Sequence, residues 1–177
     1  MSTKTAMITI AGRPNVGKST LMNALVGEKI AIVSNKPQTT RNRISGILTR
    51  GNAQFVFMDT PGFHKPRTKL GDYMVNVTRE SIADVDLTIL VVEPIANVGE
   101  QEKTLIETLA ARKCPTMLLI NKIDTVEKEE LLAIIAAYSQ AGKFDAIIPV
   151  SAKNGDGLEA LLSECEKYAV VFISIST

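Results

Sequence analysis

An eight-residue segment near the start of the chain, residues 12–19 (GRPNVGKS), has the residue types and spacing of a phosphate-binding loop. It follows an apolar run at residues 6–11 and precedes residues with helical spacing, which is the strand–loop–helix context that this motif requires. Glycines in such a loop let backbone N–H groups converge on phosphate oxygens, and the N-terminus of the next helix faces the same anion. A chance glycine turn would give the full pattern in about one chain in a hundred of this length. We expect Lys18 to reach the β- and γ-phosphates of a bound nucleotide and the Ser19 hydroxyl to bind Mg²⁺.

A second candidate lies where the apolar run at residues 55–58 ends, because Asp59 and Gly62 there are spaced as DxxG (DTPG). An aspartate and a glycine after a strand also make an ordinary turn. Beside a phosphate loop, however, the Asp59 carboxylate can hold Mg²⁺ through its water shell, and the Gly62 N–H can approach the γ-phosphate closely. We therefore expect residues 63–71, which contain Gly, Pro and Lys, to sense the γ-phosphate.

Two further segments, NKID at residues 121–124 and SAK at residues 151–153, each follow an apolar run and could select the base. Guanine presents adjacent N1–H and N2–H₂ donors, which a buried Asp124 carboxylate can accept as a pair and which adenine lacks. Asn121 can tie neighbouring loops together, the Lys122 stem can lie over the ring, and the Ala152 N–H can donate to guanine O6. The alternative for NKID is a helix N-terminal turn with a capping aspartate. The candidate nucleotide-binding residues are Gly12, Asn15, Val16, Gly17, Lys18, Ser19, Thr20, Asp59, Gly62, Asn121, Lys122, Asp124, Ser151, Ala152 and Lys153.

The elements that must position these residues alternate between strand and helix. Continuous apolar runs at residues 6–11, 55–58, 87–92, 116–120 and 146–150 predict strands of a parallel sheet covered on both faces. Helical spacing falls at residues 19–25, 72–83, 100–112, 126–140 and 158–168. The run at residues 43–49 is joined to the next strand by only residues 50–53, too short for a crossover helix, so an antiparallel hairpin is predicted. The predicted fold class is therefore α/β. It has three layers, with a six-stranded, mostly parallel sheet, one antiparallel edge strand and helices on both faces. Such sheets bind ligands at the carboxyl ends of their strands.

The composition restricts the class of protein in which these motifs lie. The chain has 177 residues, with 45% hydrophobic and 22% charged residues, which favours one globular domain over a disordered or fibrous chain. Cys114 and Cys165 have no CxxC or Cys/His spacing, so we expect neither a zinc site nor a disulfide framework. Such cysteine usage favours a reducing, cytoplasmic compartment. The net charge of +1 does not by itself indicate binding to nucleic acid. Neither a leader sequence nor an apolar run of about 18 residues, the length of a membrane span, is recognised. We expect the domain to occupy residues 1–168, and residues 169–177 to be a strand, a linker stub or a chain end.

Taken together, the order of phosphate loop, DxxG, NKxD and SAK resembles the guanine-nucleotide-binding (G) domain of translation-factor-like and Ras-like GTPases. More narrowly, GRPNVGKS, KPQTTRNRISGI, DTPGFHKP and PVSAKNGDG resemble the Era-type bacterial GTPases, over residues 6–168. The resemblance implies a P-loop NTPase G domain that binds GTP and GDP with Mg²⁺ and hydrolyses GTP as a molecular switch. For the full-length family it also implies small ribosomal subunit assembly, ribosomal RNA binding and peripheral membrane association, with a monomer in the cytoplasm.

The same resemblance assigns the catalytic set Lys18, Thr40 and Gly62. It places an effector segment at residues 38–42, where we favour Thr40 over Thr39 as the ligand of Mg²⁺ and the γ-phosphate, the alternative being a solvated polar loop. Ras-type GTPases have a water-orienting glutamine where this chain has Phe63, so we expect slow intrinsic hydrolysis. His64 is the only histidine, and we interpret it as solvated rather than as a base.

Asn15 suggests where transition-state charge could be balanced. In related GTPases with asparagine at this position, K⁺ lies beside the β- and γ-phosphates, so our hypothesis is that Asn15 helps to bind K⁺. The alternative is that Asn15 only shapes the loop through a hydrogen bond from its side chain to the backbone.

The chain departs from the Era-type pattern after Tyr168, where the KH-type RNA-binding region with its GxxG loop is not found. The residues present therefore do not support RNA binding, and we expect either a fragment or a switch domain without its effector module. A guanine-nucleotide-binding module with negligible turnover is the alternative function. An ATP-using P-loop kinase or ATPase is a third, but it has no use for NKID and SAK.

Overall fold

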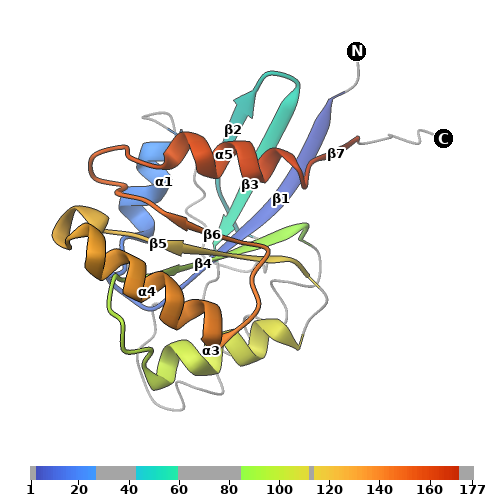
Figure 1. Cartoon of the computed structure of the whole chain (residues 1–177). Coiled ribbons are helices and arrows are strands. Elements are labelled where there is room, and N and C mark those ends of the chain that lie inside the picture. The colour runs from blue at the N-terminus through green and yellow to red at the C-terminus, as the bar shows by residue number, and fades with distance from the viewer. Residues whose placement is uncertain (1–2, 27–42, 60–84, 112–113, 172–177) are drawn as a thin grey trace.

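A mixed β-sheet forms the centre of the chain in the computed structural model, which describes residues 3–26, 43–59, 85–111 and 114–171 (Figure 1). Six strands lie side by side in the order β2-β3-β1-β4-β5-β6, and a seventh, β7, pairs with β1. The strands are β1 (Lys4–Ala11), β2 (Arg43–Arg50), β3 (Ala53–Asp59), β4 (Leu87–Val92), β5 (Thr116–Ile120), β6 (Ala146–Pro149) and β7 (Val170–Val171).

Strand directions bring the motifs to one edge of the sheet. β1 runs parallel to β3 and to β4, and β4, β5 and β6 continue the parallel arrangement. The β2–β3 pair is antiparallel, as the short connection between them predicted. Because the five parallel strands end on the same side, the residues that follow them meet at one edge. The predicted fold class is therefore confirmed.

The helices begin and end close to the predicted positions. They are α1 (Lys18–Val26), α3 (Glu100–Ala110), α4 (Lys128–Ala141) and α5 (Leu158–Glu166), and the predicted helix at residues 72–83 lies outside the described residues. The prediction for α4 started two residues early, because a 3-10 turn (Ile123–Thr125) precedes it and Glu127 forms a capping box with Glu130. Among the helices that the structure describes, none is both long and apolar enough to cross a lipid bilayer.

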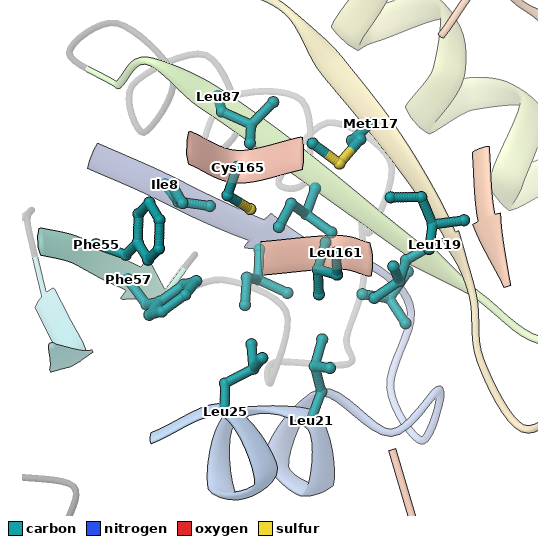
Figure 2. Close-up of a cluster of buried hydrophobic side chains, with 14 of the residues drawn as sticks. Ile8, Leu21, Leu25, Phe55, Phe57, Leu87, Met117, Leu119, Leu161 and Cys165 are labelled. Carbon is teal, nitrogen blue, oxygen red and sulfur yellow. The ribbon is translucent and has the colours of Figure 1, made fainter. Parts of the chain in front are cut away.

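Apolar side chains cover both faces of the sheet. On one face, Ile8, Phe55 and Phe57 pack with Leu21 of α1 and Leu161 of α5 (Figure 2). On the other face, the apolar residues of α3 and α4 pack against β4 and β5, as in the contacts among Leu90, Leu105, Leu109, Leu118, Ile134 and Tyr138. All six residues of β4 are buried, which explains why its apolar run is continuous rather than alternating.

The end of the described chain joins the sheet. Val170 and Val171 pair antiparallel with Thr5 and Lys4 of β1, so of the three alternatives for residues 169–177 the structure shows a short strand at its start. The sheet thus has one strand more than the six predicted. Both cysteines are free, and burial raises the pKa of the Cys165 thiol to about 12, so that thiol stays protonated in the core.

Candidate nucleotide-binding site

The phosphate loop, residues 12–19, turns sharply between β1 and α1. Asn15 adopts a left-handed φ of 69°, which asparagine tolerates better than most residues. The Lys18 ammonium donates to the Gly12 carbonyl at 3.3 Å and so closes the loop across its two ends. Ser19 and Thr20 are exposed in the first turn of α1. The loop therefore presents the lysine, the hydroxyls and the helix N-terminus that phosphate binding requires.

Gly17 is the point where the phosphate loop contacts the NKID segment. Its φ of 102° is strained for any side chain, and a Cβ there would lie 2.2 Å from the Asn121 amide nitrogen. That nitrogen donates to the Val16 carbonyl at 2.9 Å, and Asn121 is only 3% exposed. The glycine thus makes room for the hydrogen bond that holds the two motifs together.

The base-side loops, residues 121–125 and 151–156, are joined by side chains. The Ala152 N–H donates to Asn121 Oδ1 at 3.0 Å, and the Ser151 hydroxyl donates to Asp124 Oδ1 at 2.9 Å. Ser151 is fully buried and also accepts a hydrogen bond from the Asn154 N–H through its Oγ. Asn121 therefore contacts the phosphate loop and the SAK loop at once, as predicted for a residue that ties loops together.

One sequence expectation needs correction here. Asp124 is exposed rather than buried, although its carboxylate accepts a hydrogen bond from the Ser151 hydroxyl. The Ala152 N–H donates to Asn121 Oδ1, and its contact with guanine O6 stays a prediction. Any preference for guanine that depends on a desolvated Asp124 would therefore arise only when a base covers that carboxylate.

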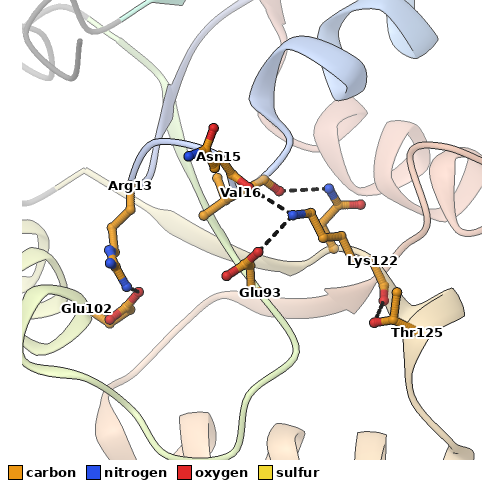
Figure 3. A network of polar contacts seen from close by, with 8 residues as sticks. Arg13, Asn15, Val16, Glu93, Glu102, Lys122 and Thr125 are labelled. Atoms are coloured by element: carbon orange, nitrogen blue, oxygen red, sulfur yellow. Dashed lines mark hydrogen bonds and ion pairs between the residues drawn. The ribbon is translucent and has the colours of Figure 1, made fainter.

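Lys122 lies between the two parts of the site (Figure 3). Its backbone is left-handed, with a φ of 64°, and its Nζ donates to the Asn15 carbonyl at 2.9 Å and to Glu93 Oε2 at 2.8 Å. On the far side of the loop, Arg13 Nη1 lies 3.2 Å from Glu102 Oε2 in the first turn of α3. Two carboxylates from the segment around the start of α3 thus contact the phosphate loop, directly or through Lys122.

Glu93 and Glu102 were not among the predicted site residues. Neither belongs to a recognised motif, and most acidic residues are solvated. One signal was available for Glu93, because it directly follows β4 and so had to lie at the ligand-binding edge of the sheet.

Two adjoining cavities mark the site. One, of about 440 Å³, is lined by Pro14, Asn15, Gly17, Lys18, Ser19, Thr20 and Lys122. The other, of about 300 Å³, is lined by Gly17, Thr20, Asn121, Lys122, Asp124, Thr125 and Lys153. They share Gly17, Thr20 and Lys122, so one extended ligand could occupy both. The first is lined mainly by the phosphate loop, and the second is lined by predicted base-selecting residues.

Part of the predicted set cannot be placed. Thr39, Thr40, Gly62, Phe63 and His64 lie outside the described residues. Asp59 ends β3, where its backbone pairs with Ile10 of the neighbouring β1, so it stands at the same edge as the phosphate loop. Its role as a Mg²⁺ ligand stays a prediction, as do the roles of Ser19, Thr40 and Asn15.

Comparison with known proteins agrees with this geometry. A family described as 50S ribosome-binding GTPase matches residues 7–122 of the chain. GTPase Era of Ruminiclostridium cellulolyticum is 51% identical over 168 residues, which are 95% of this chain and 56% of that protein. GTPase Era of Lactobacillus helveticus is 49% identical over 165 residues, or 93% of this chain and 54% of that protein. The chain spans about half the length of the curated relatives it matches.

Solved structures give the same assignment. Era in complex with MgGDPNP and nucleotides 1506–1542 of 16S ribosomal RNA matches with a TM-score of 0.79 and 30% identity, over 99% of this chain and 60% of that chain. An Aquifex aeolicus Era variant bound to GDP.AlF4⁻ matches with a TM-score of 0.76 and 30% identity, over 97% of this chain and 58% of that chain. The phosphate loop, the NKID and SAK loops and the sheet that positions them place this chain in the family of 50S ribosome-binding GTPases, as an Era-type G domain.

Proposed function

We propose that this chain binds GTP and GDP with Mg²⁺ and hydrolyses GTP slowly, as a molecular switch. The observation that carries the proposal is the double contact of Asn121, which donates to Val16 O of the phosphate loop and accepts from the Ala152 N–H of the SAK loop. This contact joins the loops that line the two cavities, which share Gly17, Thr20 and Lys122. A ligand with phosphates at one end and a base at the other fits that arrangement.

Phosphate binding would use the groups that line the larger cavity. Lys18 would exchange its contact with the Gly12 carbonyl for phosphate oxygens, and the N–H groups at the start of α1 would face the same anion. The oxygens of Ser19, Asp59 and Thr40 suit Mg²⁺, which prefers hard oxygen ligands. Bound Mg²⁺ would neutralise charge that develops on the phosphates.

Base selection would use Asp124, which the buried Ser151 hydroxyl holds at 2.9 Å. A guanine over this carboxylate offers two N–H donors, whereas adenine would cover it and leave it without a donor. We expect Asp124→Asn to weaken GDP binding about 10- to 100-fold and to narrow the difference between GDP and ADP. Titration calorimetry with both nucleotides measures this, and equal affinity of the unaltered chain for ADP and GDP would contradict the base assignment.

Hydrolysis is tested by single turnover of GTP, with the chain in excess over nucleotide and Mg²⁺ present, in KCl and in NaCl at matched ionic strength. Asn15 lines the phosphate cavity and is exposed, so it is available to a cation there. We expect faster turnover in K⁺, because a cation held by Asn15 would balance charge beside the phosphates. Equal rates in the two salts would remove K⁺ from the proposal. No hydrolysis in either salt would favour the alternative, a guanine-nucleotide-binding module with negligible turnover.

For the whole protein we propose a role in small ribosomal subunit assembly, in which this domain switches the contact with ribosomal RNA. The support is the related Era structure that contains nucleotides 1506–1542 of 16S ribosomal RNA, while the family description refers to the 50S ribosome. The net charge of +1 gives this segment little non-specific attraction to RNA. We therefore expect this chain alone to bind that RNA segment weakly, and a gel-shift assay against 23S fragments tests the choice of subunit.

A further inference from the structure

Glu93 is the first residue after β4 and belongs to none of the nucleotide-binding motifs. Its Oε2 accepts a hydrogen bond from Lys122 Nζ at 2.8 Å, and the same ammonium donates to the Asn15 carbonyl at 2.9 Å (Figure 3). The backbone around Glu93 is itself fixed, because the Asn121 N–H donates to Val92 O and the Ile95 N–H donates to Glu93 O. The carboxylate is therefore presented to Lys122 from a defined position.

The position of Lys122 determines the shape of both cavities. Its side chain lines the phosphate cavity and the base cavity, so it forms part of the wall between them. A free lysine side chain samples many rotamers, and fixing one of them costs side-chain entropy. One neutral carbonyl is a weak restraint for such a chain, whereas a carboxylate adds a charge-assisted hydrogen bond.

The environment of the pair makes the restraint effective. The Lys122 and Glu93 side chains are 38% and 37% exposed, so each is about two-thirds shielded from water. Such a pair is screened less by salt than a fully exposed pair. Lys122 also directly precedes the turn that contains Asp124, which links its placement to that of the base-selecting carboxylate.

We propose that Glu93 is a positioning residue for nucleotide binding, which acts by holding the Lys122 side chain against the Asn15 carbonyl. This inference rests on the proposed function, because it concerns the affinity of the same site for a guanine nucleotide. Without the Glu93 carboxylate, the Lys122 stem leaves its place in the wall and enters space that the ligand needs. Removal of the Glu93 carboxylate therefore lowers nucleotide affinity, but only in a chain that keeps the Lys122 ammonium.

The test is a double-mutant cycle on GDP affinity, measured by titration calorimetry with Mg²⁺. We expect Glu93→Ala to weaken GDP binding about ten-fold, and Glu93→Gln, which keeps an acceptor without the charge, about three-fold. Glu100→Gln removes one negative charge from the exposed first turn of α3 and should leave the affinity unchanged. Lys122→Met keeps most of the stem without the ammonium, so Glu93→Ala combined with Lys122→Met should bind GDP as Lys122→Met does alone.

Each other result overturns the inference. If Glu93→Ala binds GDP as the unaltered chain does, or if the losses from Glu93→Ala and Lys122→Met simply add, Glu93 does not act through Lys122. Urea unfolding of the nucleotide-free variants separates a loss of stability from a loss of affinity, and a stability loss without coupling in the cycle also overturns it. If Glu93→Ala does not fold, the same cycle with Glu93→Gln decides. Failure of the unaltered chain to bind GDP would refute the proposed function itself.

Discussion

The phosphate loop and the base-side loops are held by different kinds of interaction. In the phosphate loop, backbone conformation dominates, with left-handed or glycine-only φ angles at Gly12, Asn15 and Gly17. In the base-side loops, side chains bridge segments about 30 residues apart, as in the hydrogen bonds of Asn121 with the Ala152 N–H and of Ser151 with Asp124. The first region is a local structure that a short motif can encode, whereas the second exists only once β5 and β6 are paired.

The two regions are nevertheless not independent. The carbonyls of Val16 and Asn15 accept hydrogen bonds from the side chains of Asn121 and Lys122. The phosphate loop is therefore held in part by the base-side loops. The same hydrogen bonds also hold the side chains of Asn121 and Lys122 in the base-side loops. Comparing the affinity for GDP with that for inorganic pyrophosphate, which carries no base, separates the two regions experimentally.

The largest effect is expected from Gly17→Ala. The new Cβ would lie 2.2 Å from the Asn121 amide nitrogen, at a φ of 102° that strains any side chain. We expect a loss of about 3–5 kcal/mol in the free energy of unfolding, because backbone strain adds to the displaced Asn121 hydrogen bonds. Binding of GDP and of pyrophosphate should both be lost, which urea unfolding and calorimetry measure.

Gly51→Ala is the matched control for this substitution. Gly51 also has a positive φ, 62°, but a Cβ there would meet nothing within 4 Å. It should cost only about 1–2 kcal/mol from backbone strain and leave GDP binding intact. Equal losses for the two alanine variants would show that strain alone, rather than contact with Asn121, explains Gly17.

A smaller loss is expected from Asn121→Ala, which removes one of the two described side-chain contacts between the regions and leaves that of Lys122 with the Asn15 carbonyl. Two buried groups, Val16 O and the Ala152 N–H, would lose their partners, at a cost of about 2 kcal/mol in unfolding free energy. Affinities for GDP and for pyrophosphate should fall together. Asn154→Ala, at an exposed residue of the SAK loop, is the control. Unchanged pyrophosphate binding in Asn121→Ala would mean that the phosphate loop keeps its shape without the Asn121 contact.

Local features explain what could be predicted from the sequence. The bounds of β4 were predicted correctly because five of its six residues are apolar and all six, Thr88 included, are buried. The phosphate loop was found because its glycines, its lysine and its place after a strand are all encoded within eight residues. The β2–β3 hairpin was found from the length of its connection alone.

Contacts between distant segments explain which features could not be predicted from the sequence. Glu93 and Glu102 contact the site because β4 lies beside β1 and the first turn of α3 lies beside Arg13, and no motif marks either residue, although Glu93 directly follows β4. The exposure of Asp124 depends on which segments surround it, so a burial inferred from its role was wrong. The strand at Val170 pairs with Lys4 and Thr5 at the start of β1, which β4 does not pair with, and the pattern of the tail does not reveal this.

Glu102→Gln tests whether the phosphate loop also needs a side-chain tether. The Glu102 side chain is 10% exposed and that of Arg13 is 45% exposed, so the ion pair between them is half-screened. We expect a loss of about 1 kcal/mol in unfolding free energy, with at most a two-fold change in pyrophosphate affinity. Glu107→Gln, at an exposed position of α3, is the control for the lost charge. A large loss of pyrophosphate binding would contradict the view that backbone conformation dominates this loop.

The smallest effect is expected from Ser151→Ala, and it should be confined to the base. The Ser151 hydroxyl donates to Asp124 Oδ1 at 2.9 Å, so its loss frees the carboxylate to turn away from the base cavity. We expect GDP affinity to fall about three- to five-fold, as for the loss of one hydrogen bond to a partly exposed charge, and pyrophosphate affinity to stay the same. Ser139→Ala, on an exposed position of α4, controls for removal of a hydroxyl. Because Ser151 does not contact the phosphate loop in any described hydrogen bond, a parallel loss of pyrophosphate binding would mean that the two regions are coupled through Asp124 as well as through Asn121.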